Sequence, residues 1–156
     1  MNVTYSHRQK ALWVPLTSML FVLMAIGIFA SILHRDVDGS IIHASLAAIG
    51  CGFPGAIIFW LFDGLLVEVN TSQVILKFGH GPIKKSIERK NITSATTVRN
   101  KAIYGWGIRL TPHGWLWNIY GLDAIEITYP DGKRFRIGSD DPQQLLTAIH
   151  KESQIP

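Results

Sequence analysis

The sequence has a single cysteine and lacks the short motifs that accompany catalysis. Cys51 has no second cysteine to pair with, which excludes an intrachain disulfide and a cysteine zinc site. No two of the six histidines are four residues apart, and there is neither a Gly-x-Ser-x-Gly elbow nor a Walker-type phosphate loop. We therefore expect a protein that is not an enzyme and that uses no metal ion and no cofactor.

Charge is also missing from two long stretches near the N-terminus. Residues 11–33 and 41–62 contain no Asp, Glu, Lys or Arg. Each stretch reaches the length of ~20 apolar residues that a helix needs to cross the hydrocarbon core of a bilayer. Because unpaired backbone amides are costly in hydrocarbon, such a run is typical of a membrane helix. The sequence predicts a transmembrane helical hairpin over residues 11–63, with helices at 11–33 and 41–62.

Lysine and arginine are distributed unevenly around these two stretches. Residues 1–10 carry Arg8 and Lys10 and no acid, whereas the loop His34–Ser40 carries one arginine and two aspartates. Positively charged residues prefer the cytoplasmic side of a membrane. We therefore expect residues 1–10 to be a cytoplasmic tail, both termini to be cytoplasmic, and the loop to lie on the far side.

Small residues recur along one face of the second stretch. The set consists of Ala44, Ala48, Gly52 and Ala56. A stripe of this kind lets two helices approach closely, and the first stretch has Gly27 and Ser31 at the same spacing. The stripe therefore fits packing of the hairpin on itself, and it also fits assembly of a homo-oligomer.

The remaining residues, 64–156, are enough for one small domain with one core. They carry 12 Lys or Arg and eight Asp or Glu, which is a modest positive excess. This balance suits a domain beside an anionic membrane leaflet, and it equally suits an ordinary solvated surface. Without a nucleic-acid-binding motif, it gives no support for binding of DNA or RNA. Almost no linker precedes the first expected strand, so we expect the domain to stay near the lipid headgroups.

Alternating apolar and polar residues, interrupted by turn signals, predict about seven antiparallel strands in this region. The turn Thr111–Gly114 joins two strands rich in aromatic residues, and the turn Pro130–Gly132 joins the next two. Asp141 followed by Pro142 predicts the start of a short helix over Gln143–Glu152. About seven strands and one C-terminal helix match the plan of a pleckstrin-homology-like (PH-like) barrel or sandwich that is capped by a helix.

A more specific pattern lies in the second half of this region. Residues 107–127 read GIRLTPHGWLWNIYGLDAIEI, and DGKRFRIGSDDP and the short helix follow. The pattern resembles the bacterial PH-like domain family over residues 65–149, and the two preceding apolar helices are similar to that family's arrangement. The resemblance implies an α+β membrane protein with a PH-like domain in residues 64–156, located as a multi-pass protein in the bacterial inner membrane. It implies no particular ligand.

Basic residues gather in the first half of the expected domain. The candidate ligand-binding set is Lys77, Lys84, Lys85, Arg89 and Lys90. PH-like domains in general bind phosphorylated headgroups near this half of the barrel, so the resemblance implies a headgroup site here; solvated strand faces are the alternative. Trp60 and Trp106 are candidate anchors at the membrane interface, with core packing as the alternative for Trp106.

Two functions fit these features. The first is a membrane-anchored, non-catalytic binding module whose cytoplasmic domain engages a protein partner or lipid headgroups. The second is a structural or accessory subunit of a larger membrane complex, assembled through the transmembrane helices. The expected partners are therefore membrane lipids together with another protein or further copies of the chain, and nucleic acid is not among them.

Overall fold

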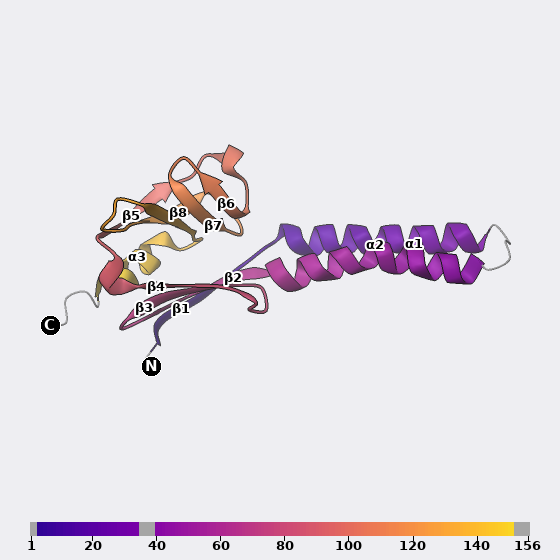
Figure 1. The fold of residues 1–156 in the computed structure, drawn as a ribbon, viewed down its shortest axis with the longest axis horizontal. Helices are drawn as coiled ribbons and strands as arrows, with labels where there is room; N and C mark the ends of the chain where they lie inside the picture. Colours follow the sequence, from indigo (N-terminus) through magenta and orange to yellow (C-terminus); the bar gives the residue numbers. More distant parts are fainter. Residues whose placement is uncertain (1–2, 35–39, 152–156) are drawn as a thin grey trace.

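The computed structural model describes residues 3–34 and 40–151. Helix α1 (Trp13–Leu33) and helix α2 (Ser40–Phe62) form a hairpin that projects from a β-rich domain (Figure 1). Both helices are long and apolar enough to cross a membrane, and only 6% of each candidate span is buried. A core helix of a soluble protein buries its apolar side, so this hairpin presents an apolar surface that the domain does not cover.

Two sheets and one helix make up the domain. The first sheet has the strand order β1-β2-β3-β4, with β1 at Val3–Lys10, β2 at Gly64–Asn70, β3 at Gln73–Phe78 and β4 at Ile83–Glu88. The second has the order β5-β8-β9-β7-β6, with β5 at Ser94–Arg99, β6 at Gly107–Thr111, β7 at Gly114–Asn118, β8 at Asp123–Thr128 and β9 at Arg134–Gly138. Short 3-10 turns, η1 (Arg89–Asn91) and η2 (Ala102–Tyr104), precede β5 and β6, and helix α3 covers Pro142–Lys151.

The expected α+β layout is confirmed, with two differences in the sheets. The described residues form nine strands, more than the seven or so that the alternation predicts. Strand β7 also pairs with β9 in parallel, with Trp115 opposite Phe135, so the sheet is not wholly antiparallel. Alternation along a strand reports which face each residue takes, and it does not report which strand lies beside it. The strand order therefore could not follow from the pattern.

Residues 3–10 form a strand, whereas residues 1–10 were expected to be a tail. Val3–Lys10 pairs antiparallel with β2, and the side chain of Gln9 donates a hydrogen bond to the carbonyl of Tyr120 (Nε2–O 3.0 Å). The stretch VTYSHRQK has a single aliphatic residue, so its own hydrophobicity does not predict a strand. The open edge of β2 supplies the backbone partners that make it one. The domain therefore includes residues from both sides of the hairpin.

The main core lies between the two sheets and continues into the base of the hairpin. Ala11 and Val14 belong to the same buried cluster as the strands, and Phe62 at the end of α2 packs edge-on against Phe78 of β3 with ring centres 5.6 Å apart. The backbone amide of Ala11 donates to the carbonyl of Asp63 (3.1 Å), which ties the two chain crossings together. The hairpin and the domain therefore share packing, and no flexible linker separates them.

Within the hairpin, burial falls along the stripe of small residues. Ala44 is fully buried, Ala48 and Gly52 are half-buried, and Ala56 is exposed. The contact with α1 passes instead to Gly55, where a Cβ would lie 2.7 Å from the Cβ of Phe21. An α-helix has about 3.6 residues per turn, so residues spaced four apart rotate gradually around its surface. The last residue of the stripe, Ala56, therefore no longer faces α1.

Candidate functional site

Groups that could hold a metal ion do not come together in residues 3–34 and 40–151, where no cluster of three His, Cys, Asp or Glu side chains occurs. Cys51 is a half-buried residue of α2 and packs within the hairpin. The features of the domain that stand out are instead its charged and aromatic surfaces near the hairpin and one buried ion pair.

The five basic residues predicted as one site lie on different surfaces. Lys77 of β3 and Lys84 of β4 are directly opposite each other and point to the outer face of the first sheet. Lys85 points to the other face, where its Nζ lies 5.1 Å from the ring centre of Phe135. Neighbouring residues of a strand take opposite faces, which separates Lys84 from Lys85.

Arg89 and Lys90 lie after β4, at its end farther from the hairpin. Arg89 donates from Nη1 to the carbonyl of Asn70 (3.1 Å) and from Nη2 to the carbonyl of Ile149 in the last turn of α3. A guanidinium at this end of a helix is favoured by the helix dipole. Lys90 pairs with Glu88 (Nζ–Oε2 3.1 Å). These contacts give Arg89 a structural role that joins the first sheet to α3.

A different basic cluster forms at the base of the hairpin. Strand pairing aligns four residues in one row across the outer face of the first sheet: Arg8, Leu66, Lys77 and Lys84. Arg8 contacts Asp63 and Lys77 contacts Glu68, with N–O distances of 2.7 and 2.9 Å, whereas Lys84 is exposed and has no ion pair among the residues that the structure describes. We call Arg8, Lys77 and Lys84 the cation row. Two of these three cations are thus already paired with carboxylates of the domain, and Lys84 is the one of the three left to attract an external anion.

The turn between β3 and β4 fixes this cluster next to the hairpin. The backbone amide of His80 donates to the carbonyl of Trp60 in α2 (3.2 Å), and His80 Nδ1 lies 3.2 Å from the same oxygen. At Gly79 a Cβ would come within 2.3 Å of that carbonyl oxygen, and φ is +52°, so glycine allows this close approach. The turn lies beside the domain end of α2 (Figure 1).

Three aromatic rings stack at the same end of the domain. Trp13, the first residue of α1, lies 6.4 Å from Trp106 with 13° between the ring planes, and Trp106 lies 5.9 Å from Tyr120 with 30°. The indole of Trp13 donates to the carbonyl of Ile119 (2.8 Å), and that of Trp106 donates to the carbonyl of Gly121 (3.3 Å). Trp106 and Tyr120 are each 41% exposed, so Trp106 is a surface residue.

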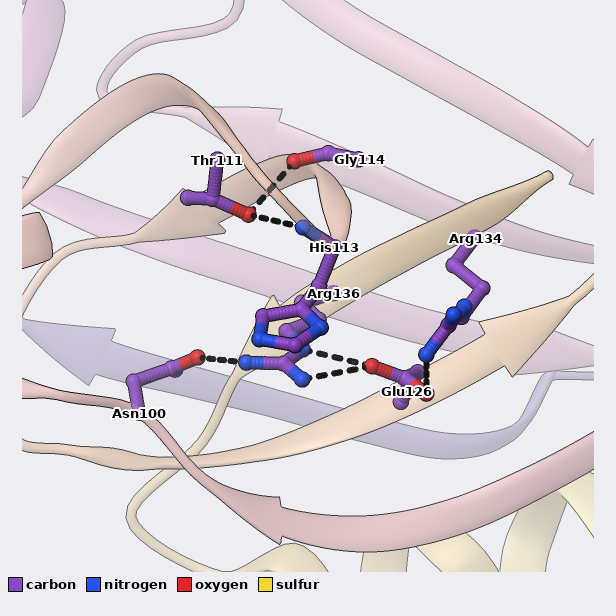
Figure 2. A network of polar contacts seen from close by, with 7 residues as sticks. All are labelled: Asn100, Thr111, His113, Gly114, Glu126, Arg134 and Arg136. Carbon is purple, nitrogen blue, oxygen red and sulfur yellow. Dashed lines mark hydrogen bonds and ion pairs between the residues drawn. The ribbon is translucent and has the colours of Figure 1, made fainter.

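An ion pair is shielded from solvent on the outer face of the second sheet (Figure 2). Arg136 of β9 contacts Glu126 of β8 through Nε and Nη2, both 2.7 Å from Oε2, and donates from Nη1 to Asn100 Oδ1 (2.9 Å). The side chains of Arg136 and Glu126 are 8% and 13% exposed. Asn100 begins the segment between β5 and β6, so this network holds that segment against the sheet.

The predicted turn between β6 and β7 is confirmed, and Figure 2 shows how it closes. The hydroxyl of Thr111 donates to the carbonyl of Gly114 (2.8 Å) and accepts from the backbone amide of His113 (3.2 Å). Gly114 has a φ of +92°, and a Cβ there would lie 2.0 Å from the carbonyl oxygen of Arg134. This turn therefore brings β7 close to the start of β9 only because the residue is glycine.

Tyr5 and Asp131 are among the ionisable groups whose pKa values are shifted by their surroundings, and both lie away from the hairpin. Tyr5 of β1 is half-buried, and burial followed by the nearby charges of Asp141 and Asp140 raises its pKa to about 12. In the β8–β9 turn, the hydrogen bond from Lys133 lowers the pKa of the Asp131 carboxyl.

Sequence reasoning missed the cation row and the Arg136 network, because both are products of register. Residues far apart in the sequence meet only when the pairing of the strands is known. The one local signal was Arg136 itself, a charged residue between the apolar Phe135 and Ile137. Alternation with these two neighbours indicates that Arg136 takes the other face of the strand, and it does not identify a partner.

Comparison of the chain with protein-family models, with curated proteins and with solved structures found no match in any of the three.

Proposed function

We propose that the chain is a membrane-anchored, non-catalytic binding module. In this proposal α1 and α2 cross a bacterial inner membrane, and a PH-like domain lies against its cytoplasmic face. The proposal is supported by two helices of sufficient length whose candidate spans are only 6% buried. The observation that carries it is the junction, because the cation row and the aromatic stack both lie where the apolar hairpin leaves the domain.

The ligand that we propose is the acidic headgroup of a lipid in the same leaflet. A lysine near an anionic surface contributes about 1 kcal/mol, and this attraction fades within a Debye length of ~8–10 Å. Shared packing at the junction keeps the cation row near the hairpin, so its charges stay within that range. Lys84, which lies opposite Lys77 and has no carboxylate partner among the described residues, is the cation of the row that a headgroup phosphate would pair with.

The PH-like assignment rests on the order of elements and on the pattern in residues 107–127. Three strands of the first sheet, the second sheet and a C-terminal helix follow one another in the chain after the hairpin, and β1, the fourth strand of the first sheet, precedes the hairpin. The parallel pair β7–β9 and the contribution of β1 are departures from the expected plan. Both departures change which strands lie side by side, and neither changes the position of α3 at the end of the chain.

Retention of acidic lipid by the full-length protein tests the proposed ligand. We expect native mass spectrometry after gentle extraction to find phosphatidylglycerol-type lipid on the wild type. The double variant Lys77→Ala/Lys84→Ala should retain it with an affinity reduced by up to roughly thirtyfold, which corresponds to about 1 kcal/mol for each lysine.

The matched control removes the same charge elsewhere. Lys90→Ala/Lys133→Ala changes two exposed lysines that are paired with Glu88 and Asp131, away from the cation row. Retention should stay near that of the wild type. Equal losses in the two double variants would contradict a headgroup site at the cation row, because they would reflect net charge alone.

A second function, that of an accessory subunit, has an observation of its own. The hairpin carries a shallow apolar groove that is lined by Val22, Ala25, Ile26, Phe29, Ala48 and Gly52. A helix of another subunit would fill it, and Gly52→Leu would then block assembly, whereas Ile49→Leu on an exposed position would not. An unchanged mass of the extracted complex in Gly52→Leu would count against this function.

A further inference from the structure

The segment between β5 and β6 ends in an apolar tip that the domain does not bury. The turn η2 presents Ile103 with 87% of its surface exposed, the largest value among the exposed large apolar residues of the described chain. Lys101 and Ala102 before it are also exposed. An isoleucine exposed to this extent contributes little buried apolar area to the stability of the domain.

Hydrogen bonds at both ends hold this tip in place. The backbone amide of Asn100 donates to the carbonyl of Leu122 (2.7 Å), and its side chain accepts from Arg136 (2.9 Å). At the other end the Trp106 indole is bonded to Gly121 (3.3 Å). Because the segment is already ordered, it loses little conformational entropy when its tip enters another environment.

The aromatic stack sets the depth of this segment relative to the hairpin. Trp106 packs on Trp13, and Trp13 is the first residue of the candidate span Trp13–Ile32. Tryptophan and tyrosine favour the boundary between hydrocarbon and water, where an apolar ring and a polar N–H or O–H are both satisfied. Strand β6, which follows the segment, lies on the hairpin side of the domain (Figure 1). The exposed surface of the stack is thus continuous with that of the hairpin, where Leu12 is 60% exposed.

The charges beside the tip fit a lipid surface. Lys101 precedes it, and Arg109 follows it and donates from Nε to the carbonyl of Trp106 (3.0 Å). The nearby carboxylate of Asp123 is paired with Arg99 (2.9 Å). An apolar residue with basic residues on its flanks is the composition of surface elements that enter the headgroup region of anionic bilayers.

We infer that residues 100–107 are a second membrane contact, with Ile103 inserted at the boundary between headgroups and acyl chains of the leaflet that α1 enters. The inference rests on the proposed membrane insertion of the hairpin. The first sheet, which carries the cation row, and the second sheet, beside which the tip lies, are on two sides of the hairpin base (Figure 1). Together they hold the domain in one orientation on the bilayer, which a hairpin alone does not do.

Depth-dependent quenching in the full-length protein tests this inference. On a Cys51→Ala background, a polarity-sensitive fluorophore is attached in turn to Ile103→Cys, Ile26→Cys and Thr71→Cys. Ile26 is in the middle of α1 and 59% exposed, and Thr71 is exposed in the β2–β3 turn at the far end of the first sheet. Each protein is placed in vesicles of phosphatidylglycerol and phosphatidylcholine with nitroxide lipids at shallow or deep positions.

We expect the label at position 103 to lose fluorescence to the shallow nitroxide, the label at 26 to the deep one, and the label at 71 to neither. If 26 is quenched while 103 behaves like 71, the tip contact is refuted and the anchoring proposal stands. If 26 is not quenched, membrane anchoring itself fails. A blue-shifted label at 103 that neither nitroxide quenches would mean that protein covers the tip, which also overturns the inference.

A second pair of variants isolates the isoleucine. With the label moved to Lys101→Cys, adding Ile103→Asp should abolish quenching by the shallow nitroxide, because a carboxylate does not enter the boundary of an anionic leaflet. Adding Thr97→Asp instead, at an exposed position of β5, should leave the quenching in place. Equal quenching in both would show that Ile103 does not hold the segment at the membrane.

Discussion

At the scale of single residues, Arg136 is a charged side chain that is shielded from solvent and paired with its neighbours. Its guanidinium is satisfied by Glu126 and Asn100, with little access to water. Removing one partner of such a pair strands the other, which costs about 3–5 kcal/mol, whereas an exposed pair is worth about 0–1 kcal/mol. Arg99 and Asp123 form an exposed pair on the same sheet, with side chains 70% and 49% exposed.

These two pairs give a matched prediction for stability. Arg136→Met should lower the free energy of unfolding by about 3 kcal/mol, because Glu126 is left without its partner. Arg99→Met should change it by less than about 1 kcal/mol. Urea unfolding of the full-length protein in detergent, followed by tryptophan fluorescence, measures both. Equal effects would show that the shielded pair has no special role in holding the segment that starts at Asn100.

Tyr5 gives a prediction for the alkaline range. Its pKa rises from 10.0 to about 12, chiefly through burial, so the unfolded chain loses this proton at a lower pH than the folded one. The contribution to stability is therefore complete below pH 10 and is lost as the pH rises toward 12. Tyr5→Phe should reduce the fall of Tm over this interval. A fall as steep as that of the wild type would contradict the account of Tyr5.

At the scale of elements, β1 is the part of the fold that changes the description of the domain most. It pairs with the edge of β2, and its Gln9 reaches Tyr120 beyond β7. The main-chain bonds of this strand, and not a large apolar face, join it to the sheet. The domain is therefore completed by a segment that lies before the hairpin in the chain.

Removing β1 tests whether residues 3–10 are part of the domain or a free tail. Deleting residues 2–10 should lower the Tm of the domain by well over ~5 °C, since even 1 kcal/mol shifts a domain of this size by roughly 4–8 °C. Replacing the same residues by a Gly-Ser sequence of equal length should have a similar effect, because glycine has a low strand propensity and the side-chain contacts of Tyr5, Arg8 and Gln9 are lost. A Tm unchanged in either variant would mean that residues 1–10 behave as a tail.

The elements that could be predicted from the sequence are those with a strong local signal. The two uncharged stretches predicted α1 and α2. The β6–β7 and β8–β9 turns were predicted from Thr111–Gly114 and Pro130–Gly132, and the start of α3 from Asp141 and Pro142. Asp141 Oδ1 accepts from the backbone amide of Gln144 (3.2 Å), as an N-cap does. Each of these signals acts over a few residues.

The candidate site could be predicted only in part, because its geometry depends on long-range pairing. Lys77 and Lys84 were in the predicted set, but Arg8 joins them through β1, whose pairing has no local signal. Arg89 was also in the predicted set, but its guanidinium bonds to carbonyls of Asn70 and of α3 and not to a ligand. These partners become neighbours only in the folded chain, so the sequence did not indicate them. Alternation alone would have separated Lys85 from Lys84.

At the scale of the whole molecule, an apolar hairpin is joined to a domain whose cation row and aromatic stack lie at the same end. Val14 and Ala11 pack in the core of the domain, so the hairpin and the domain are oriented relative to each other by buried contacts. If the hairpin spans a membrane, the domain has little freedom to turn away from it. The proposed headgroup site and the proposed membrane contact of Ile103 both depend on this one arrangement.

The spanning hairpin is the central claim, and the accessibility of single cysteines on either side of it tests the claim most directly. On a Cys51→Ala background, His34→Cys lies at the end of α1 and Thr71→Cys lies in the domain, and both positions are exposed. A membrane-impermeant maleimide is added to intact bacterial cells, with any outer membrane removed, and then to lysed ones. The account predicts that position 34 reacts in intact cells and that position 71 reacts only after lysis. Equal reaction of both positions in intact cells, or of neither, would show that the hairpin does not cross the membrane as proposed.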